Sequence, residues 1–126
     1  MDRDQFCNEI LKIDDRIRFV GIYDEGEFYF KMREGLTSYH TPEQTENSLV
    51  EAEYRWASRK KDAPNFGKPI FAMAKYEKIY RITIPIGTAG LIIVTTELNV
   101  NMEEIVEKII DKREKLTINN YSKINI

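Results

Sequence analysis

The chain has 126 residues, of which 42% are hydrophobic and 32% are charged, and its formal net charge is −2. This length predicts a single globular domain that needs no metal or disulfide to fold, and the small net charge gives no reason to expect nucleic acid or an anionic membrane as a partner. The single cysteine excludes an internal disulfide and favours a cytoplasmic setting, and the longest apolar run, AGLIIV, is far shorter than the ~20 residues of a membrane-spanning helix.

The first part of the chain predicts a helix followed by a β-hairpin. Apolar residues recur at spacings of three and four over residues 3–14, which is the period of a helix. Runs of β-branched and aromatic residues at 17–23 and 28–34 flank the sequence DEG, whose glycine suits a short hairpin loop. We therefore expect two antiparallel strands after the first helix.

A long helix is predicted over residues 41–61. Its first residues, TPEQ, place Thr41 at the N-cap and Pro42 at the first helical position, where no N–H group is missed. The helix is expected to end before DAPNFGKP, which reads as a turn segment.

From Pro69 onward the apolar period changes to two, which predicts three strands at 70–76, 79–86 and 91–96. The last of them is apolar on both faces and belongs in the middle of a sheet. Pro85 cannot donate a backbone hydrogen bond, so its end of the strand is expected at an edge or a bulge.

A closing helix is predicted over residues 102–116, with Arg113 as the only break in its apolar stripe. The domain is therefore expected to span 1–116, followed by a frayed polar tail at 117–126. The element order is α-β-β-α-β-β-β-α, and short hairpins require antiparallel neighbours. The predicted fold class is α+β, a five-stranded antiparallel sheet covered by three helices.

This order of elements resembles the roadblock family, the dynein-light-chain-like domains related to longins and profilin. The resemblance rests on IRFVGIYDEGEFYF, helix 41–61, IFAMAKYEKIYRITIPIGTAGLIIVTT and helix 102–116, and it covers the chain apart from the tail. Family members often have a small-residue, aliphatic central helix, whereas this one is charged and carries Tyr54 and Trp56. The resemblance implies a homodimer formed through helix 41–61 and strand 70–76. It also implies a non-enzymatic scaffold or regulator that docks a small Ras-like GTPase.

Helix 41–61 carries two apolar stripes, with Glu53 between them. Leu49, Ala52 and Trp56 form one stripe, and Val50, Tyr54 and Ala57 form the other. One interpretation is a wide apolar face packed on the sheet, which would bury Glu53 and require a cationic partner or an escape to water. The interpretation we favour is that one stripe meets the sheet and the other meets a second chain.

Strand 70–76 supports the dimer, because a long edge strand with few charges is a pairing hazard unless a twin strand covers it. We also expect three rim charges to contact the partner protein. The predicted dimer-interface residues are Leu49, Glu53, Tyr54, Trp56, Phe71 and Met73, and the predicted partner-binding residues are Arg55, Arg59 and Lys61.

Two other classes of function, a small-molecule sensor and an enzyme, are alternatives. A small-molecule sensor would hold its ligand between sheet and helix, with tyrosine hydroxyls lining the pocket; the candidates are Tyr23, Tyr29, Tyr76 and Tyr80. An enzyme has little support, because NFGKP lacks the residues of a phosphate-binding P-loop and His40 is the only histidine. Cys7 reads as a small core residue rather than a nucleophile, and we expect no catalytic residue, metal site or cofactor.

Overall fold

The computed structural model describes residues 2–116 and confirms the predicted fold class and element order. The predicted tail, 117–126, lies outside the described residues. The elements are α1 (Arg3–Leu11), β1 (Ile17–Asp24), β2 (Glu27–Met32), α2 (Pro42–Lys60), α3 (Ala63–Phe66), β3 (Ala72–Lys75), β4 (Tyr80–Ile86), β5 (Gly90–Thr96) and α4 (Met102–Leu116). The short helix α3 lies where only a turn was predicted. Among residues 2–116, no helix has the length and apolar character needed to cross a membrane.

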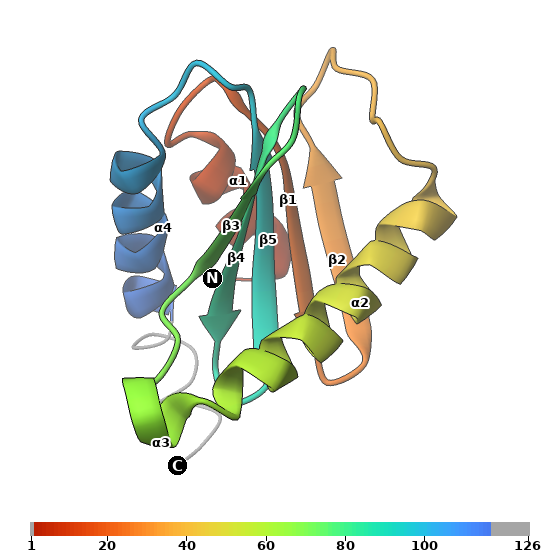
Figure 1. Ribbon diagram of the computed structural model, residues 1–126. Helices are drawn as coiled ribbons and strands as arrows, with labels where there is room; N and C mark the ends of the chain where they lie inside the picture. Colours follow the sequence, from red (N-terminus) through yellow and green to blue (C-terminus); the bar gives the residue numbers. More distant parts are fainter. Residues whose placement is uncertain (1, 117–126) are drawn as a thin grey trace.

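The five strands form one antiparallel sheet in the order β2-β1-β5-β4-β3 (Figure 1). β5 is the central strand, as its apolar sequence predicted. The pairing of β1 with β5 joins the two hairpin units, with Gly21 opposite Ile93 and Tyr23 opposite Leu91. β2 and β3 are the two edges of the sheet.

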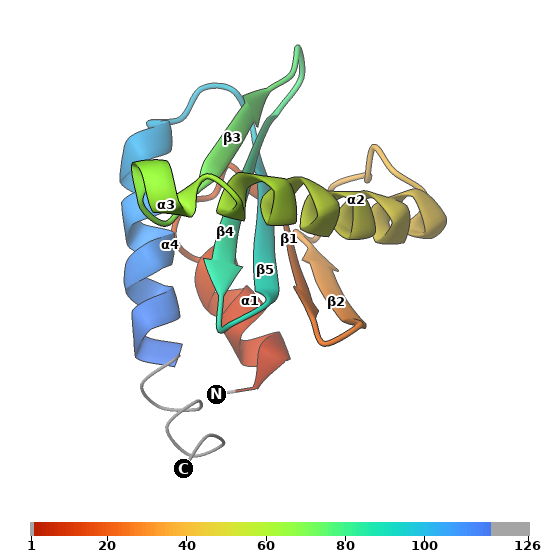
Figure 2. The ribbon, with the colours of Figure 1, turned by 60° about the horizontal axis from the view of Figure 1, so that its bottom comes forward.

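Helices cover both faces of the sheet. α1 and α4 lie on one face and α2 crosses the other (Figures 1 and 2). Alternation along β5 divides the core between the faces, because Ile92 and Val94 point toward α1 and α4 while Leu91 and Ile93 point toward α2. The α1/α4 side holds the larger of the two hydrophobic clusters.

Side-chain caps define where α1 and α2 begin. At α2 the backbone N–H of Gln44 donates to Thr41 Oγ1 at 3.2 Å, and the Gln44 side chain accepts from the Thr41 N–H at 2.9 Å. Asp2 and Gln5 form the same reciprocal capping box at α1. Such caps satisfy N–H groups that have no partner within the helix, and each contributes about 1 kcal/mol.

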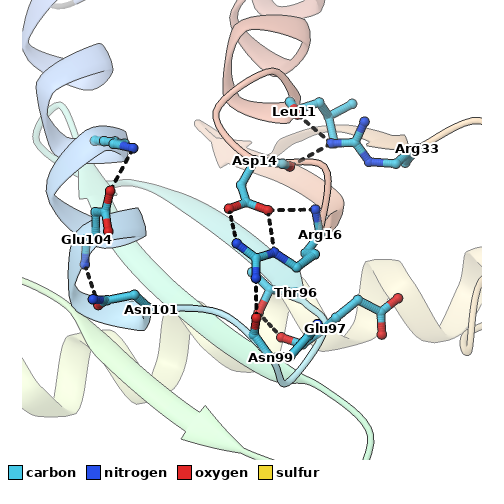
Figure 3. Close-up of polar contacts among 10 residues, drawn as sticks. Leu11, Asp14, Arg16, Arg33, Thr96, Glu97, Asn99, Asn101 and Glu104 are labelled. Carbon is cyan, nitrogen blue, oxygen red and sulfur yellow. Dashed lines mark hydrogen bonds and ion pairs between the residues drawn. The ribbon is translucent and has the colours of Figure 1, made fainter.

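Two arginines fasten the connections at the α1 end of the sheet (Figure 3). Arg16 forms a bidentate pair with the Asp14 carboxylate, at 2.9 and 2.8 Å, and also donates to the carbonyl of Asn99 in the β5–α4 connection. Arg33 donates to the carbonyls of Leu11 and Asp14, the latter at 2.9 Å. These contacts satisfy carbonyls at the end of α1 and tie the two connections together.

Pro85 and Arg113 together limit the length of β3. The β3–β4 ladder ends at Ala72 opposite Thr83, and continuing it by two residues would place Ile70 opposite Pro85. Pro85 has no N–H to donate, and its carbonyl accepts from Arg113 Nη1 at 3.1 Å. The predicted strand 70–76 is therefore shortened to Ala72–Lys75, and Pro85 lies at a local edge of the sheet, as predicted.

Candidate interaction surfaces

The inner stripe of α2 packs on its own sheet. Leu49, Ala52 and Trp56 are buried, Trp56 to 4% exposure, and they form a cluster with Leu91 and Ile93 of β5. Two predicted dimer-interface residues, Leu49 and Trp56, thus lie in the core of the subunit. The physical reason is that the sheet needs a large apolar cover on this face, and these side chains supply it.

The close approach of α2 depends on a glycine in β1. A Cβ atom at Gly21 would lie 3.3 Å from Leu49 Cδ2 and 3.0 Å from the Phe19 ring. The missing side chain leaves room for Leu49 to reach the sheet.

The outer side of α2 presents a different surface. Tyr54 is 73% exposed, and Ala57 on the same stripe is exposed as well. Glu53 lies half-buried between the stripes, where the hydroxyl of Tyr23 donates to its carboxylate and thereby raises the pKa of Tyr23. Glu53 therefore finds a hydrogen-bond donor on its own sheet, a solution that neither interpretation of the sequence contained.

A second apolar surface lies along the β3 edge. β4 occupies one side of β3, and no strand of the described chain occupies the other. Met73 is 48% exposed, Phe71 is also exposed, and upstream Phe66 and Ile70 are more exposed still, Phe66 to 84%. Four large apolar side chains within residues 66–73 are thus open to solvent, next to a row of unpaired backbone groups.

The three predicted rim charges are all exposed. Arg55 lies 3.8 Å from Glu51, one turn earlier on α2, an exposed pair that contributes little to stability. Arg59 lies in the last turn of the helix and Lys61 is its C-cap, where cations complement the negative end of the helix dipole. All three remain available to an acidic partner surface.

A cleft of about 970 Å³ opens between the N-terminal half of α2 and the sheet. Phe19 and Ile93 contribute to its apolar lining, and segments 38–40 and 76–79 contribute further walls. Of the four tyrosines predicted to line a pocket, only Tyr76 does so. Two of the others, Tyr29 and Tyr80, belong to the α1/α4 face, and Tyr23 packs on Phe28 at 4.9 Å between ring centroids.

Arg81 of β4 spans the cleft from the sheet to α2. Its two terminal nitrogens donate to Ser48, to the hydroxyl and to the carbonyl, the latter at 3.1 Å. Its Nε is buried and has no hydrogen-bond partner in the described chain. Burial is the main cause that lowers the pKa of Arg81, and the positive charge of nearby Arg55 is the second. A lowered pKa indicates that no negative charge fully offsets the loss of water around this cation.

Comparison with known proteins places the fold. No protein-family profile matches the chain, and no curated protein matches it in sequence. Among solved structures, a roadblock/LC7 domain from Streptomyces avermitilis superposes with a TM-score of 0.75 at 7% identity, over 94% of this chain and 98% of that one. The chain has the roadblock fold.

Two further roadblock-fold structures come from Myxococcus xanthus. MglB superposes with a TM-score of 0.72 at 15% identity, over 94% of each chain. MglC superposes with a TM-score of 0.63 at 6% identity, over 94% of this chain and 99% of that one. At these identities the comparison establishes the fold and leaves the surfaces to be read from this chain's own residues.

Cys7 and His40, the two residues of the chain that could form a nucleophile and base pair, lie far apart in the fold. Burial raises the pKa of the Cys7 thiol to about 12, which favours the protonated thiol over the nucleophilic thiolate. His40 lies at the cleft, on the opposite side of the sheet from Cys7. Residues 2–116 contain no group of three or more histidine, cysteine or acidic residues arranged to hold a metal ion.

The residues that gather at the cleft could not be grouped from the sequence. Arg81, Ser48 and Tyr39 come from a strand, a helix and a loop, so no spacing along the chain links them. The strand pattern gives no signal either, because Arg81 alternates with Tyr80 and Ile82 and shares with Thr83 what reads as the polar side of β4, although this side faces α2. A charged residue at such a position requires a polar partner across the interface with the helix.

Proposed function

We propose that the protein is a non-enzymatic, cytoplasmic, homodimeric scaffold or regulator that docks a small Ras-like GTPase. The observation that carries the dimer is the free edge of β3 with exposed large apolar side chains at and before it. An uncovered apolar edge favours aggregation, and pairing with its twin across a two-fold axis covers it in a closed assembly.

The dimer would form through the outer side of α2 and the edge of β3. Tyr54, Phe71 and Met73 are the exposed apolar side chains on these elements, and aromatic residues are enriched at interface centres. Glu53 would lie at the seam, with Tyr23 already bonded to it. Leu49 and Trp56 would contribute indirectly, because they hold α2 on the sheet in the position that exposes Tyr54 to the second chain. MglB, a protein with a similar fold, has been observed in a tetrameric arrangement.

A small GTPase is proposed as partner because of the roadblock fold, which is an argument by analogy. Arg55, Arg59 and Lys61 add a local reason. They give the C-terminal half of α2 a cationic rim that suits an acidic surface, in a chain whose overall charge is slightly negative.

Sedimentation velocity tests the dimer. We expect a species of twice the 14.8 kDa chain mass at tens of micromolar, and dissociation in a double variant with Tyr54→Glu and Met73→Glu. Leu36→Glu, a charge placed at an exposed apolar residue of the loop before α2, serves as the control and should leave the dimer intact. A wild-type chain that sediments only as a monomer at these concentrations contradicts the dimer.

Binding of a GTPase is tested separately. A Ras-like GTPase captured from the native organism should bind the purified protein again, with affinities that differ between its GDP form and its form bound to a non-hydrolysable GTP analogue. Arg59→Glu with Lys61→Glu should weaken binding by about tenfold or more, whereas Lys108→Glu with Lys115→Glu on α4 should not. Equal losses with both pairs would show that α2 is not the docking surface.

A small-molecule sensor is the second candidate, and the cleft of about 970 Å³ favours it. A thermal-shift screen against metabolites and nucleotides would separate it from the pure scaffold. A large rise in melting temperature with one compound is the expected result for a sensor, and flat curves throughout would remove this candidate.

A further inference from the structure

We propose that the cleft between α2 and the sheet binds a small organic anion, with Arg81 and Lys78 as its charge partners. The ligand class is a carboxylate or phosphate group attached to a flat, largely apolar body. This inference names the ligand chemistry of the second candidate function and does not depend on the dimer or on a GTPase.

The shape of the cleft suits a small molecule. Its volume of about 970 Å³ lies at the upper end of the range for ligand pockets, which is roughly 300–1,000 Å³. Phe19, Leu49 and Ile93 give it apolar surface, and Tyr39 and Tyr76 add aromatic walls. Such a lining favours a body with a planar apolar face.

The charges that line the cleft are unbalanced. Four cationic and two acidic side chains contribute to its walls. Arg18 is already paired with Glu97 at 2.6 Å, and Arg55 lies near Glu51. Lys78 and Arg81 form no ion pair with any side chain of residues 2–116.

Arg81 is the centre of this unbalanced charge. Among residues 2–116 its guanidinium donates only to the neutral oxygens of Ser48, and its buried Nε has no partner there. Taking a guanidinium out of water without a counter-charge is costly, and an anion in the adjoining space is the group that offsets the cost. Arg is also suited to planar carboxylate and phosphate groups.

Two cation–π contacts join other residues that line the cleft. The Tyr39 ring lies between two cations, with Arg18 at 4.6 Å and Lys78 at 5.2 Å from its centroid. These contacts join the loop before α2 to the β3–β4 turn and keep the ammonium of Lys78 at the cleft. An anion near Arg81 would therefore meet a second positive charge.

Amide chemical shifts from ¹⁵N-labelled protein test the proposal. The probes are phenyl phosphate and benzoate, which differ in the anionic group, and benzyl alcohol, which is neutral. Both anions should shift amides of residues 45–55 and 76–81, and the tighter of the two identifies the preferred head group. An absence of localised shifts at millimolar probe, or equal binding of benzyl alcohol, would overturn the proposal.

Two lysines of the β3–β4 hairpin provide a matched pair of variants. Lys78 lines the cleft, whereas Lys75 contacts Tyr80 on the other face of the sheet at 5.6 Å. Lys78→Met should weaken binding of the anionic probes by about tenfold, and Lys75→Met should leave it unchanged. Equal affinities for Lys78→Met and the wild type would overturn the role of Lys78 in the site.

Arg81→Met is expected to abolish binding at millimolar probe. Because Arg81 also bridges β4 and α2, the amide spectrum of this variant without ligand shows whether α2 has shifted. If α2 has shifted, the test of the anion site rests on the result for Lys78→Met. Sedimentation of Lys78→Met should match the wild type, so a failed dimer and a failed anion site give different results.

Discussion

Among single residues, Asp14 gives the most direct electrostatic test of stability. Its carboxylate accepts from the Arg16 side chain and from the Arg16 backbone N–H, and these bonds lower its pKa from 3.8 to about 2. A lowered folded-state pKa means that the stabilisation is complete above about pH 4 and is lost as the pH falls toward 2.

Replacing Asp14 by Asn should remove this stabilisation, about 1 kcal/mol after allowance for solvent screening of an exposed pair. Urea unfolding at pH 7 and between pH 4 and 2 measures it. The free-energy difference between wild type and Asp14→Asn should shrink across the acid range, whereas the neighbouring exposed Asp15→Asn should follow the wild type. A constant difference between pH 4 and 2 would refute the role of this carboxylate.

Gly90, at the start of β5, lies where a larger residue is expected to lower stability. A Cβ atom there would lie 2.8 Å from the Ile86 carbonyl oxygen, a backbone atom that cannot move without distorting the β4–β5 turn. Gly90→Ala should lower the free energy of unfolding by about 1–3 kcal/mol. Thr88→Ala, an exposed change in the same turn, should cost less than about 0.5 kcal/mol. Equal unfolding midpoints for the two variants would contradict this argument.

At the scale of elements, α2 divides into a structural side and an interaction side. Trp56→Ala should destabilise the subunit by about 3–5 kcal/mol, because Trp56 is buried on the sheet, whereas Tyr54→Ala should change subunit stability by about 0.5 kcal/mol or less. Unfolding in the dilute, monomeric range isolates the subunit. A similar loss in both variants would mean that both sides of α2 pack internally.

The element pattern was predicted well where apolar residues keep a regular spacing, and also in β5, whose sequence is apolar on both faces. The 3–4 spacing located α1, α2 and α4, and alternation located the strands. The predicted length of β3 was wrong, and its physical cause lies in residues far along the chain. β3 stops at Ala72 because Pro85 and Arg113, from later elements, occupy the place opposite Ile70. The segment DAPNFGKP was predicted as a turn because of its prolines and glycine, but its residues Ala63–Phe66 form the short helix α3.

At the scale of the whole molecule, the two sides of the sheet differ in the size of their cores. The α1/α4 side buries the larger cluster, whereas α2 is held mainly by Leu49, Ala52 and Trp56. Native-state hydrogen exchange should therefore show that α2 amides open at lower free energy than those of β5 and α4. Protection of α2 should rise with protein concentration if the dimer forms there. Equal protection of α2 and β5 in dilute protein would contradict the two-core description.

The candidate site was harder to predict than the fold. Periodicity revealed two stripes on α2 but could not assign which one faces the sheet, so Leu49 and Trp56 were grouped with Tyr54. Glu53 of α2 meets Tyr23 of β1, which lies thirty residues earlier in the chain, so helix periodicity could not reveal the pair. The cleft draws on segments that only the folded sheet brings together, and Arg81 reads in the sequence as an ordinary polar residue of an alternating strand.

The pairing of β1 with β5 has a consequence for biosynthesis. The middle of the sheet forms only when residues 17–24 meet residues 90–96, so the chain emerging from the ribosome cannot complete its centre until β5 has left the exit tunnel. Until then, the apolar inner edge of the first hairpin has no permanent neighbour. We expect nascent chains halted before Gly90 to bind chaperones and to be cut readily by proteases, and chains that extend past α4 to resist both.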